Sequence, residues 1–416
     1  MNFNHREHRG KSEKAQSLTK KVQEIFCILG VIFLCLLWLE AEEKISLDVV
    51  IKEAKENNPE IKMLQNKYLA TVQKITAVKT WEYPQLGVET NGSEQMYFIY
   101  QMLPFPGKLS LRGKVAENES KIIEQELNSK IREVVAMVKK TYWNYWLINK
   151  IIEIYHENID LMKRFLNIAN TQYAIGKVTQ TDVLKANTEL ALMENMLVMF
   201  EQEKASTQAE LNALLNRPPD TPLGKPEKPE KKEIKYTYEE IENIALKNSP
   251  EIKAKEYLYQ RNISALSLSK REWYPDIMAG LKIDNMLNRT FMAQISVPLF
   301  YKKQFSIIEM SKKEKDMSEW DLQATKINTL KKLKNLWSKY ESVKKSILTY
   351  ETIILPLAKQ TLEITEAGYR VGKNNFLDLL DSQRKYLDYN INYYKLITEK
   401  ETIISELEQS VGIDLK

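Results

Sequence analysis

The chain has 416 residues, of which 43% are hydrophobic and 28% charged, with only 12 glycines and 13 prolines. This profile suits long helices better than a compact α/β enzyme. The formal net charge of +5 is too mild and too dispersed for a nucleic-acid-binding protein, so we expect no nucleic-acid partner.

An apolar segment, residues 25–39, follows a basic stretch that ends in Lys20-Lys21. It is shorter than the roughly 20 residues that a membrane-spanning helix needs, but it suits the core of an export signal. We therefore predict an export signal over residues 1–41. An uncleaved anchor is the alternative, because Leu39 is a poor residue two positions before a cleavage site at Ala41. Both cysteines lie inside this segment, so the mature protein would have no disulfide framework.

Two helix-start signals with the same composition occur in the two halves of the chain. Asn58-Pro59 and Ser249-Pro250 are each followed by Glu-Ile-Lys, and proline after Asn or Ser is typical of the first helical position. The helices that follow are predicted over 61–80 and 252–271. Each meets an aromatic-proline stop, at Tyr83-Pro84 and Tyr274-Pro275.

Apolar and polar residues then partly alternate, over about 85–103 and about 276–299. The alternation around an Asn-Gly or Asn-Arg turn predicts a β-hairpin in each half. An isolated hairpin is marginal in water, so these hairpins need partners from other chains or a closed sheet. Two ordinary surface hairpins are the simpler alternative.

The longest helical segments are predicted over about 108–174 and about 303–370. The first carries two apolar stripes side by side, which indicates neighbouring helices on both flanks. Trp143 and Trp146 belong to the second stripe and are expected in the core rather than in a ligand site. At 1.5 Å per residue such a helix reaches roughly 100 Å, too long for a compact domain.

Each long helix ends in a stretch that occurs twice, at 173–184 and 369–380. In both copies a Tyr precedes a Gly-Lys pair by three residues, and an Asp-apolar-Leu follows. Gly176 and Gly372 are predicted to end one helix in a left-handed conformation, and Thr179 or Asn374/Asn375 to cap the next.

The repeated signals indicate an internal duplication. We predict a first repeat over 42–215, a Pro/Lys-rich linker over 216–235 and a second repeat over 236–416. The short helices 61–80 and 177–214 together nearly match the long helix between them, and 252–271 with 375–411 repeat this arrangement. Each half is thus predicted as one long helix packed on two short ones stacked end to end.

With these motifs, residues 45–412 resemble the TolC family of outer-membrane channel proteins. The resemblance rests on the duplicated Pro-Glu-Ile starts, the aromatic-proline hairpin entries, the Pro-Phe-Pro-Gly-Lys turn at 104–108 and the two Tyr-x-x-Gly turns. The turn at 104–108 is most similar to the heavy-metal efflux branch. The resemblance implies a fold that is mainly α with a small β part.

In that family, three chains form a homotrimer whose strands make a 12-stranded outer-membrane barrel and whose helices make a periplasmic tunnel. The resemblance therefore implies an exit channel for tripartite efflux or type I secretion, in contact with outer-membrane lipid. A periplasmic adaptor protein and an inner-membrane pump are its implied partners. Closed barrels leave no unpaired strand edge in lipid, which fits the predicted hairpins.

The resemblance also implies roles for residues at the periplasmic tip. Asp378 and Asp381 match two acidic residues that ring the narrowest point of the tunnel, although both could simply stabilise the first turn of a helix. Asp182 and Tyr369 match residues that latch the closed tip, whereas a basic latch residue is replaced by Asn374. The residues implied to line the turns and meet an adaptor are Gly176, Thr179, Thr181, Gly372, Asn375 and Leu380.

We predict no enzymatic activity, no cofactor and no metal site. The three histidines are His5, His8 and His156, so no histidine cluster or catalytic triad can form. The Gly-Lys pairs lack the flanking residues of a phosphate-binding loop. A periplasmic adaptor and a soluble coiled-coil scaffold are the alternative functions. The duplication argues against the first, and the hairpins and the export signal argue against the second.

Overall fold

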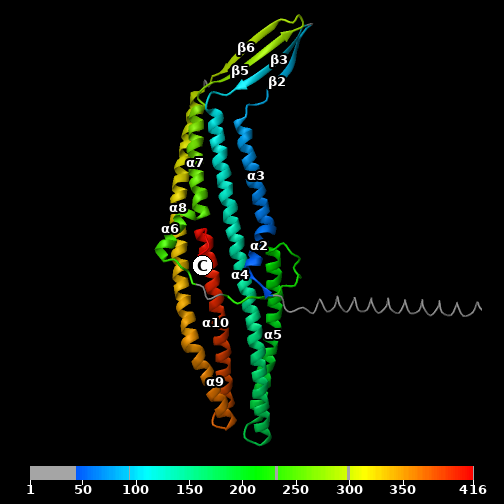
Figure 1. The fold of residues 1–416 in the computed structure, drawn as a ribbon, viewed down its shortest axis with the longest axis vertical. Helices are drawn as coiled ribbons and strands as arrows, with labels where there is room; N and C mark the ends of the chain where they lie inside the picture. Colours follow the sequence, from blue (N-terminus) through cyan, green and yellow to red (C-terminus); the bar gives the residue numbers. More distant parts are fainter. Residues whose placement is uncertain (1–43, 93, 230–232, 298–299, 416) are drawn as a thin grey trace, which may run out of the picture.

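A computed structural model of the chain describes residues 44–92, 94–229, 233–297 and 300–415, and the predicted export signal lies outside them. The molecule is a long rod of helices, with a four-stranded sheet at one end and two helix–helix turns at the other (Figure 1). The fold is mainly α with a small β part, as the sequence predicts.

The same order of elements occurs in both halves of the chain. The first half contains β1 (Lys44–Ile45), α2 (Leu47–Asn57), α3 (Pro59–Lys79), β2 (Gln85–Asn91), β3 (Glu94–Leu103), α4 (Lys108–Ala174) and α5 (Gln180–Leu214). After β4 (Lys225–Pro226), the second half contains α6 (Tyr238–Asn248), α7 (Pro250–Arg271), β5 (Asp276–Asp284), β6 (Arg289–Ser296), α8 (Tyr301–Thr349), η1 (Tyr350–Ile354), α9 (Leu355–Arg370) and α10 (Phe376–Val411).

The second long segment is helical from Tyr301 to Arg370, as predicted, but it is not a regular α-helix throughout. Where α4 runs unbroken, its counterpart contains the π-helical turn η1 between α8 and α9. Pro356 follows at the start of α9. Proline has no N–H to donate and its ring crowds the preceding turn, so the regular hydrogen-bond ladder cannot continue through this point.

The short helices stack end to end, as their lengths predict. In the first half the side chain of Asn58 accepts hydrogen bonds from the N–H groups of Glu60 and Ile61 at the start of α3. Its amide nitrogen donates to the carbonyl of Leu214, 3.1 Å away, at the end of α5. In the second half Gly412, just after α10, packs so closely on Asn248 that an added Cβ would lie 2.7 Å from the Asn248 carbonyl oxygen.

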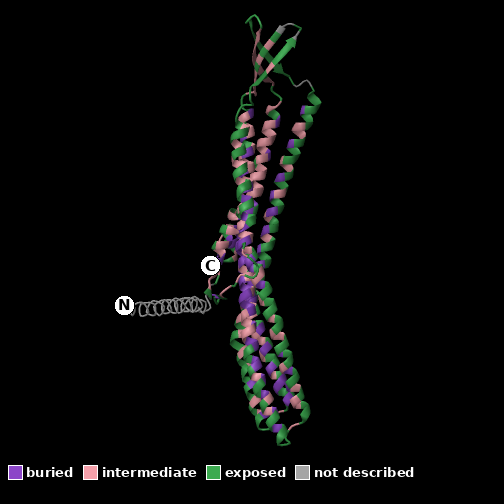
Figure 2. Ribbon diagram, turned by 90° about the vertical axis from the view of Figure 1, so that its right-hand side faces the viewer, coloured by how far each residue is buried: buried purple, intermediate pink, exposed green. Residues whose placement is uncertain are grey.

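The core follows α4, which lies between the helices of both halves. Figure 2 shows the buried positions running along the middle of the rod, whereas the sheet is mostly exposed. Trp143 and Trp146 are buried in one continuous cluster with Tyr142 and Phe165, so their predicted place in the core is confirmed. A second cluster joins α6, α8 and α10.

Tyr142 fixes both the start of the described chain and the linker to α4. Its hydroxyl donates to the Ile45 carbonyl and accepts from the Glu227 N–H, each at 2.8 Å. Burial, above all, raises the pKa of Tyr142 to about 12. The adjacent strands β1 and β4 pair in parallel, so the linker that was predicted as irregular contains a short piece of sheet.

The two predicted hairpins form one antiparallel sheet in the order β2-β3-β5-β6. The central pair joins the halves, with Ile99 opposite Leu281 and Tyr100 opposite Gly280. The stacked rings of Phe98 and Tyr100 cover Gly87 and Gly280, where an added Cβ would collide with them. Among the described residues, β2 and β6 each have a strand partner on one side only.

An ion pair between a buried lysine and a half-buried aspartate connects the sheet to the helices. The Lys108 ammonium, almost fully buried, lies 2.8 Å from an oxygen of Asp276 and 2.7 Å from the Tyr274 carbonyl. The same oxygen of Asp276 accepts from the Phe105 N–H. Gly107, with φ of 92°, supplies the left-handed turn that directs Lys108 inward, which gives a physical reason for the Pro-Phe-Pro-Gly-Lys sequence.

Lys108→Met should lower stability by about 3 kcal/mol, because it removes one partner and leaves the Asp276 carboxylate without its counter-charge. Lys108→Met with Asp276→Leu should cost less, since no uncompensated charge then remains. The measurement is thermal unfolding of the detergent-solubilised protein, with Lys114→Met on the exposed face of α4 as control. Equal melting temperatures for Lys108→Met and the control would contradict this role.

Candidate functional site

Both repeated turns lie together at the end of the rod opposite the sheet (Figure 1). Gly176 and Gly372 have φ of 73° and 76°, the left-handed conformation predicted for them. In each turn the N–H groups after the helix donate back to its last carbonyls, as Lys177 does to Gln172 and Lys373 to Gly368. We call the two turns with the first residues of α5 and α10 the tip.

Only the second turn has the predicted side-chain cap. The Asn375 side chain accepts a hydrogen bond from the Asp378 N–H at 2.8 Å, so α10 starts as expected. Thr179, at the matching position before α5, makes no side-chain cap hydrogen bond.

Asp378 and Asp381 are exposed, one helical turn apart on α10. The Asp381 carboxylate lies 2.8 Å from the Lys385 ammonium, and both side chains are largely in solvent. The hydrogen bond to Asp381 raises the pKa of Lys385. Within one chain, therefore, both carboxylates project outward, and only one of them is neutralised by a neighbouring cation.

Asp182 and Tyr369, predicted as latch residues, come together from the two turns. The Tyr369 side chain is 1% exposed and packs on Phe376, and its hydroxyl has no hydrogen-bond partner in the described part of the chain. Burial, followed by the negative charge of Asp182, raises the pKa of Tyr369 to about 12. The pair thus holds a neutral phenol close to a carboxylate.

Gln172 joins the two turns directly and was missed from the sequence. Its buried amide nitrogen donates to the carbonyls of Tyr369 and Arg370, at 3.0 and 3.1 Å. The matching residue in the second copy is Gly368, where an added Cβ would lie 2.5 Å from the Asn374 amide. The presence of Gln172 in one copy and glycine at the matching position of the other was the sequence signal from which this contact could have been suspected.

Further polar contacts cross from the first half to α10 above the tip. Arg384 binds the nearly buried carboxylate of Glu189 on α5 through two nitrogens. Gln383 donates to Asn158 on α4 at 3.1 Å, within the core. These hydrogen bonds and this ion pair fix which helices are neighbours and how far each is shifted along the other. Apolar packing alone would constrain the two helices less.

The residues implied for adaptor contact differ in exposure. Leu380 is 6% exposed and belongs to the core, so its side chain is not on the surface of the single chain. Leu377, on the adjacent face, is 54% exposed. The exposed members of the implied set are Gly176, Thr179, Thr181, Gly372 and Asn375.

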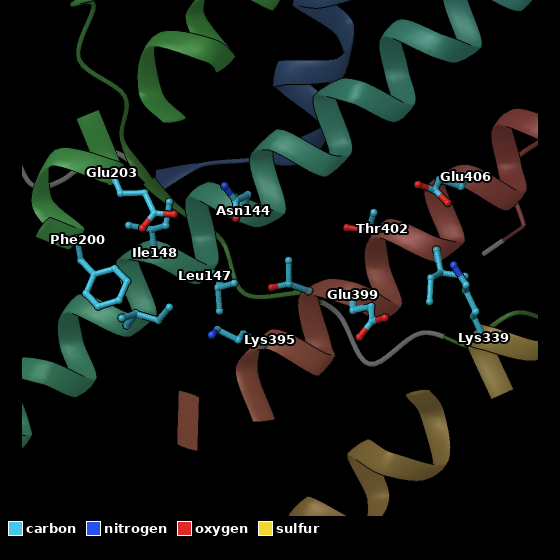
Figure 3. Close-up of a pocket in the computed structure, with 13 residues that line it drawn as sticks. Asn144, Leu147, Ile148, Phe200, Glu203, Lys339, Lys395, Glu399, Thr402 and Glu406 are labelled. Atoms are coloured by element: carbon cyan, nitrogen blue, oxygen red, sulfur yellow. The ribbon is translucent and has the colours of Figure 1, made fainter. Parts of the chain in front are cut away.

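A cavity of about 590 Å³ lies higher up, between α4, α5, α8 and α10 (Figure 3). Its wall includes Leu147, Ile148 and Phe200, and its charged side chains are of both signs. Lys339 and Lys395 accompany Glu203, Glu399 and Glu406, so the charges favour neither an anion nor a cation. Among the described residues, no group of three or more His, Cys, Asp or Glu side chains could hold a metal ion.

In the described part of the chain, no helix is both long and apolar enough to cross a membrane.

Tyr369 should ionise late in an alkaline titration. Its folded-state pKa of about 12 exceeds the ordinary value of 10.0, so its contribution to stability is complete below pH 10 and is lost as the pH rises towards 12. Tyrosinate absorbance should show one fewer late-ionising group in Tyr369→Phe. Asp182→Asn should move this ionisation to lower pH, because the charge that opposes it is removed.

Tyr142→Phe is the matched control, since it removes a second tyrosine of pKa about 12 that lies far from the tip. A late ionisation that does not respond to Asp182→Asn would contradict the electrostatic link between the two turns.

Both the sequence and the fold of the chain are similar to those of known proteins. It is 24% identical, over 333 residues, to the cobalt-zinc-cadmium resistance protein CzcC of Cupriavidus metallidurans, and the match covers 74% of each chain. Its fold is similar to that of CusC, with a TM-score of 0.79 at 16% identity, over 88% of this chain and 92% of that one. The open state of the Neisseria gonorrhoeae MtrE outer membrane channel matches with a TM-score of 0.76 at 15% identity, over 89% of each chain.

The sequence model of the family described as outer membrane efflux protein matches residues 50–217 and 242–412. The match covers both halves of the chain. The chain therefore belongs to the outer membrane efflux protein family.

Proposed function

We propose that three copies of this chain form the outer-membrane exit channel of a tripartite efflux system. Their sheets close into one 12-stranded barrel, and their helices enclose a tunnel through the periplasm. A periplasmic adaptor and an inner-membrane pump deliver the substrate to the tip. The observation that carries this proposal is the sheet, whose two edges have no strand partner in the described part of the chain and whose two faces differ chemically.

One face of the sheet is mostly apolar on all four strands, although Thr90, Gln95, Gln101 and Arg289 also lie on it. Its rows follow from the strand register, which sets Leu86, Ile99, Leu281 and Phe291 side by side. The further apolar residues of this face are Val88, Tyr97, Leu103, Ile277, Ile283 and Ile295. An exposed apolar face of this size is unfavourable in water and suits the lipid-facing side of a barrel.

The opposite face is mixed and includes an ion pair between Lys282 and Glu89 at 2.7 Å. Gln85, Thr290, Gln294 and Ser296 share this face. Alternation of apolar and polar residues along each strand is typical of barrels that enclose water. Because free strand edges are not tolerated in lipid, β2 and β6 need strands from neighbouring copies.

Exposed apolar residues on the outer helices also support assembly. They recur at helical spacing on α8, at Met310, Met317 and Ile327, and on η1 and α9, at Ile353, Leu357 and Ile364. On the first half, α5 exposes Leu184, Leu192 and Met199. Such stripes on both flanks of a rod are suited to neighbours in a ring of helices.

Paired cysteines in β2 and β6 should form disulfides between chains. Within one chain these strands are three spacings apart, roughly 14 Å, which is too far for a disulfide. Val88→Cys combined in turn with Phe291→Cys and Ile295→Cys, with Cys27 and Cys35 replaced by Ser, should yield covalent trimers in at least one register. The measurement is a non-reducing gel of the outer-membrane fraction.

Val88→Cys alone is the control and should give no disulfide-linked dimers or trimers on the gel. A detergent-resistant trimer in unheated outer-membrane extract is the expected companion result. A soluble chain would instead indicate the scaffold alternative, and a chain that follows the inner membrane would indicate an adaptor.

For the tip we propose a cation-attracting gate of Asp378 and Asp381, which would bring six carboxylates together in a trimer. Asp182 and Tyr369 act as the latch that keeps the turns together. The exposed turn residues Gly176, Thr179, Thr181, Gly372 and Asn375 receive the adaptor, and Leu380 supports them from the core. The exposed position of both carboxylates on one face of α10 supports this assignment.

The cargo we propose is a divalent metal cation. The relative CzcC is named for cobalt, zinc and cadmium resistance, and it supports this choice together with the turn at 104–108. An acidic constriction also favours cations over neutral or anionic solutes.

Asp378→Ala with Asp381→Ala should raise single-channel conductance in planar bilayers and abolish block by divalent cations, because the ring of negative charge is lost. Lys385→Ala should strengthen the block, since it removes the cation beside Asp381. Glu157→Ala with Asp160→Ala, an exposed acidic pair with the same spacing on α4, is the matched control. Unchanged conductance in the Asp378/Asp381 variant would remove their assigned role.

A further inference from the structure

A second cavity, of about 280 Å³, lies where the two halves of the chain meet at mid-height of the rod. It is formed by the last turn of α2, a stretch of α4, the α6–α7 junction and the residues that follow α10. Its basic residues are Lys55, Arg132 and Lys253. The amides of Gln125, Asn128 and Asn248 also line it, and none of its described lining residues is acidic.

Two of its three cations are without a counter-charge. Within the described residues, Lys55 and Lys253 make no ion pair, whereas Arg132 lies 3.0 Å from one oxygen of Asp414 at the rim. Asp414 is 70% exposed and the contact uses a single guanidinium nitrogen, so Arg132 retains donors for a second acceptor. Lys55 is exposed and Lys253 and Arg132 are half-buried, and positive charges that share a cavity repel one another unless an anion lies between them.

The start of α7 lies beside the same cavity. At the matching helix start in the first half, Asn58 caps the free N–H groups of α3 with its side chain. Ser249, its counterpart, makes no side-chain cap hydrogen bond, and Pro250 lines the cavity. Pro250 has no N–H to donate, so this uncapped helix start contributes partial positive charge, which attracts anions, rather than a hydrogen bond.

We propose that this cavity binds an oxyanion, a phosphate or a carboxylate group, which bridges the two halves of the chain. The ligand accepts hydrogen bonds from Lys55 and Arg132 on the first half and from Lys253 on the second, beside the positive end of α7. The amide groups of Gln125, Asn128 and Asn248 supply further donors. In the periplasm this chemistry is offered by free phosphate and by the carboxylates of cell-wall peptides.

The first test is titration of the purified, detergent-solubilised protein with inorganic phosphate against chloride at matched ionic strength, followed by thermal unfolding. Phosphate should raise the melting temperature by a few degrees and chloride should not, because only the folded chain forms the site. Lys55→Gln with Lys253→Gln should weaken phosphate binding at least tenfold. The matched control, Lys52→Gln with Lys270→Gln, removes the same charge from exposed positions of α2 and α7 outside the cavity.

Equal effects of phosphate and chloride, or equal losses in the two double variants, would overturn the proposal. Co-sedimentation with purified peptidoglycan identifies the source of the anion. Sedimentation that depends on Lys55 and Lys253 assigns it to the cell wall, and phosphate binding without sedimentation assigns it to a free ion. Single-channel conductance of the same variants is measured in parallel, so that failure of the anion site and failure of the channel are distinguishable.

Discussion

The apolar seam along α4 positions almost everything else in the molecule. Tyr142, Trp143 and Trp146 fill its middle, and helices of both halves pack against it from several sides. Burial of such large rings is a major stabilising contribution, because a fully buried aromatic side chain removes a large apolar area from water. The sheet contributes no residue to the core clusters of the described chain, whereas the tip adds Tyr369, Phe376 and Leu379 to the same cluster as the seam. Helix α4 connects the two ends.

The duplication gives the chain two similar halves, and the differences between them carry specific information. Gln172 joins the turns where its counterpart is Gly368, and Asn58 caps a helix where its counterpart Ser249 does not. The Gln172 contact joins the two halves, whereas Asn58 binds Leu214 within the first half. Once the two repeats of a duplicated chain differ in sequence, each side of a contact between them can carry a different residue. Here a glutamine side chain on one repeat meets backbone carbonyls on the other.

Much of this arrangement was predictable from local signals. Helix starts are set locally by proline after Asn58 and Ser249, and helix ends by glycine at 176 and 372. The spacing of apolar residues along α4 indicates which of its sides are buried. The sequence could not reveal that Gln172 reaches the carbonyls of Tyr369 and Arg370, because that contact depends on how distant segments approach one another. For the same reason Leu380 was assigned to the surface by its place in a motif, whereas the packing of α10 buries it. The π-helical turn escaped detection because Pro356 alone signals a break but not its form.

The π-helical turn η1 determines which side of the second long helix faces the core below it. Val343 on α8 and Leu362 on α9 are both buried, yet in a regular α-helix their separation exceeds five whole turns by about one residue. The wider turn at 350–354 takes up that surplus, so Leu362 returns to the side on which Val343 lies. Without it, the lower part of the helix would be rotated by about 100°. Tyr369 would then face away from Phe376, and the two ends of this helix could not both pack on α10.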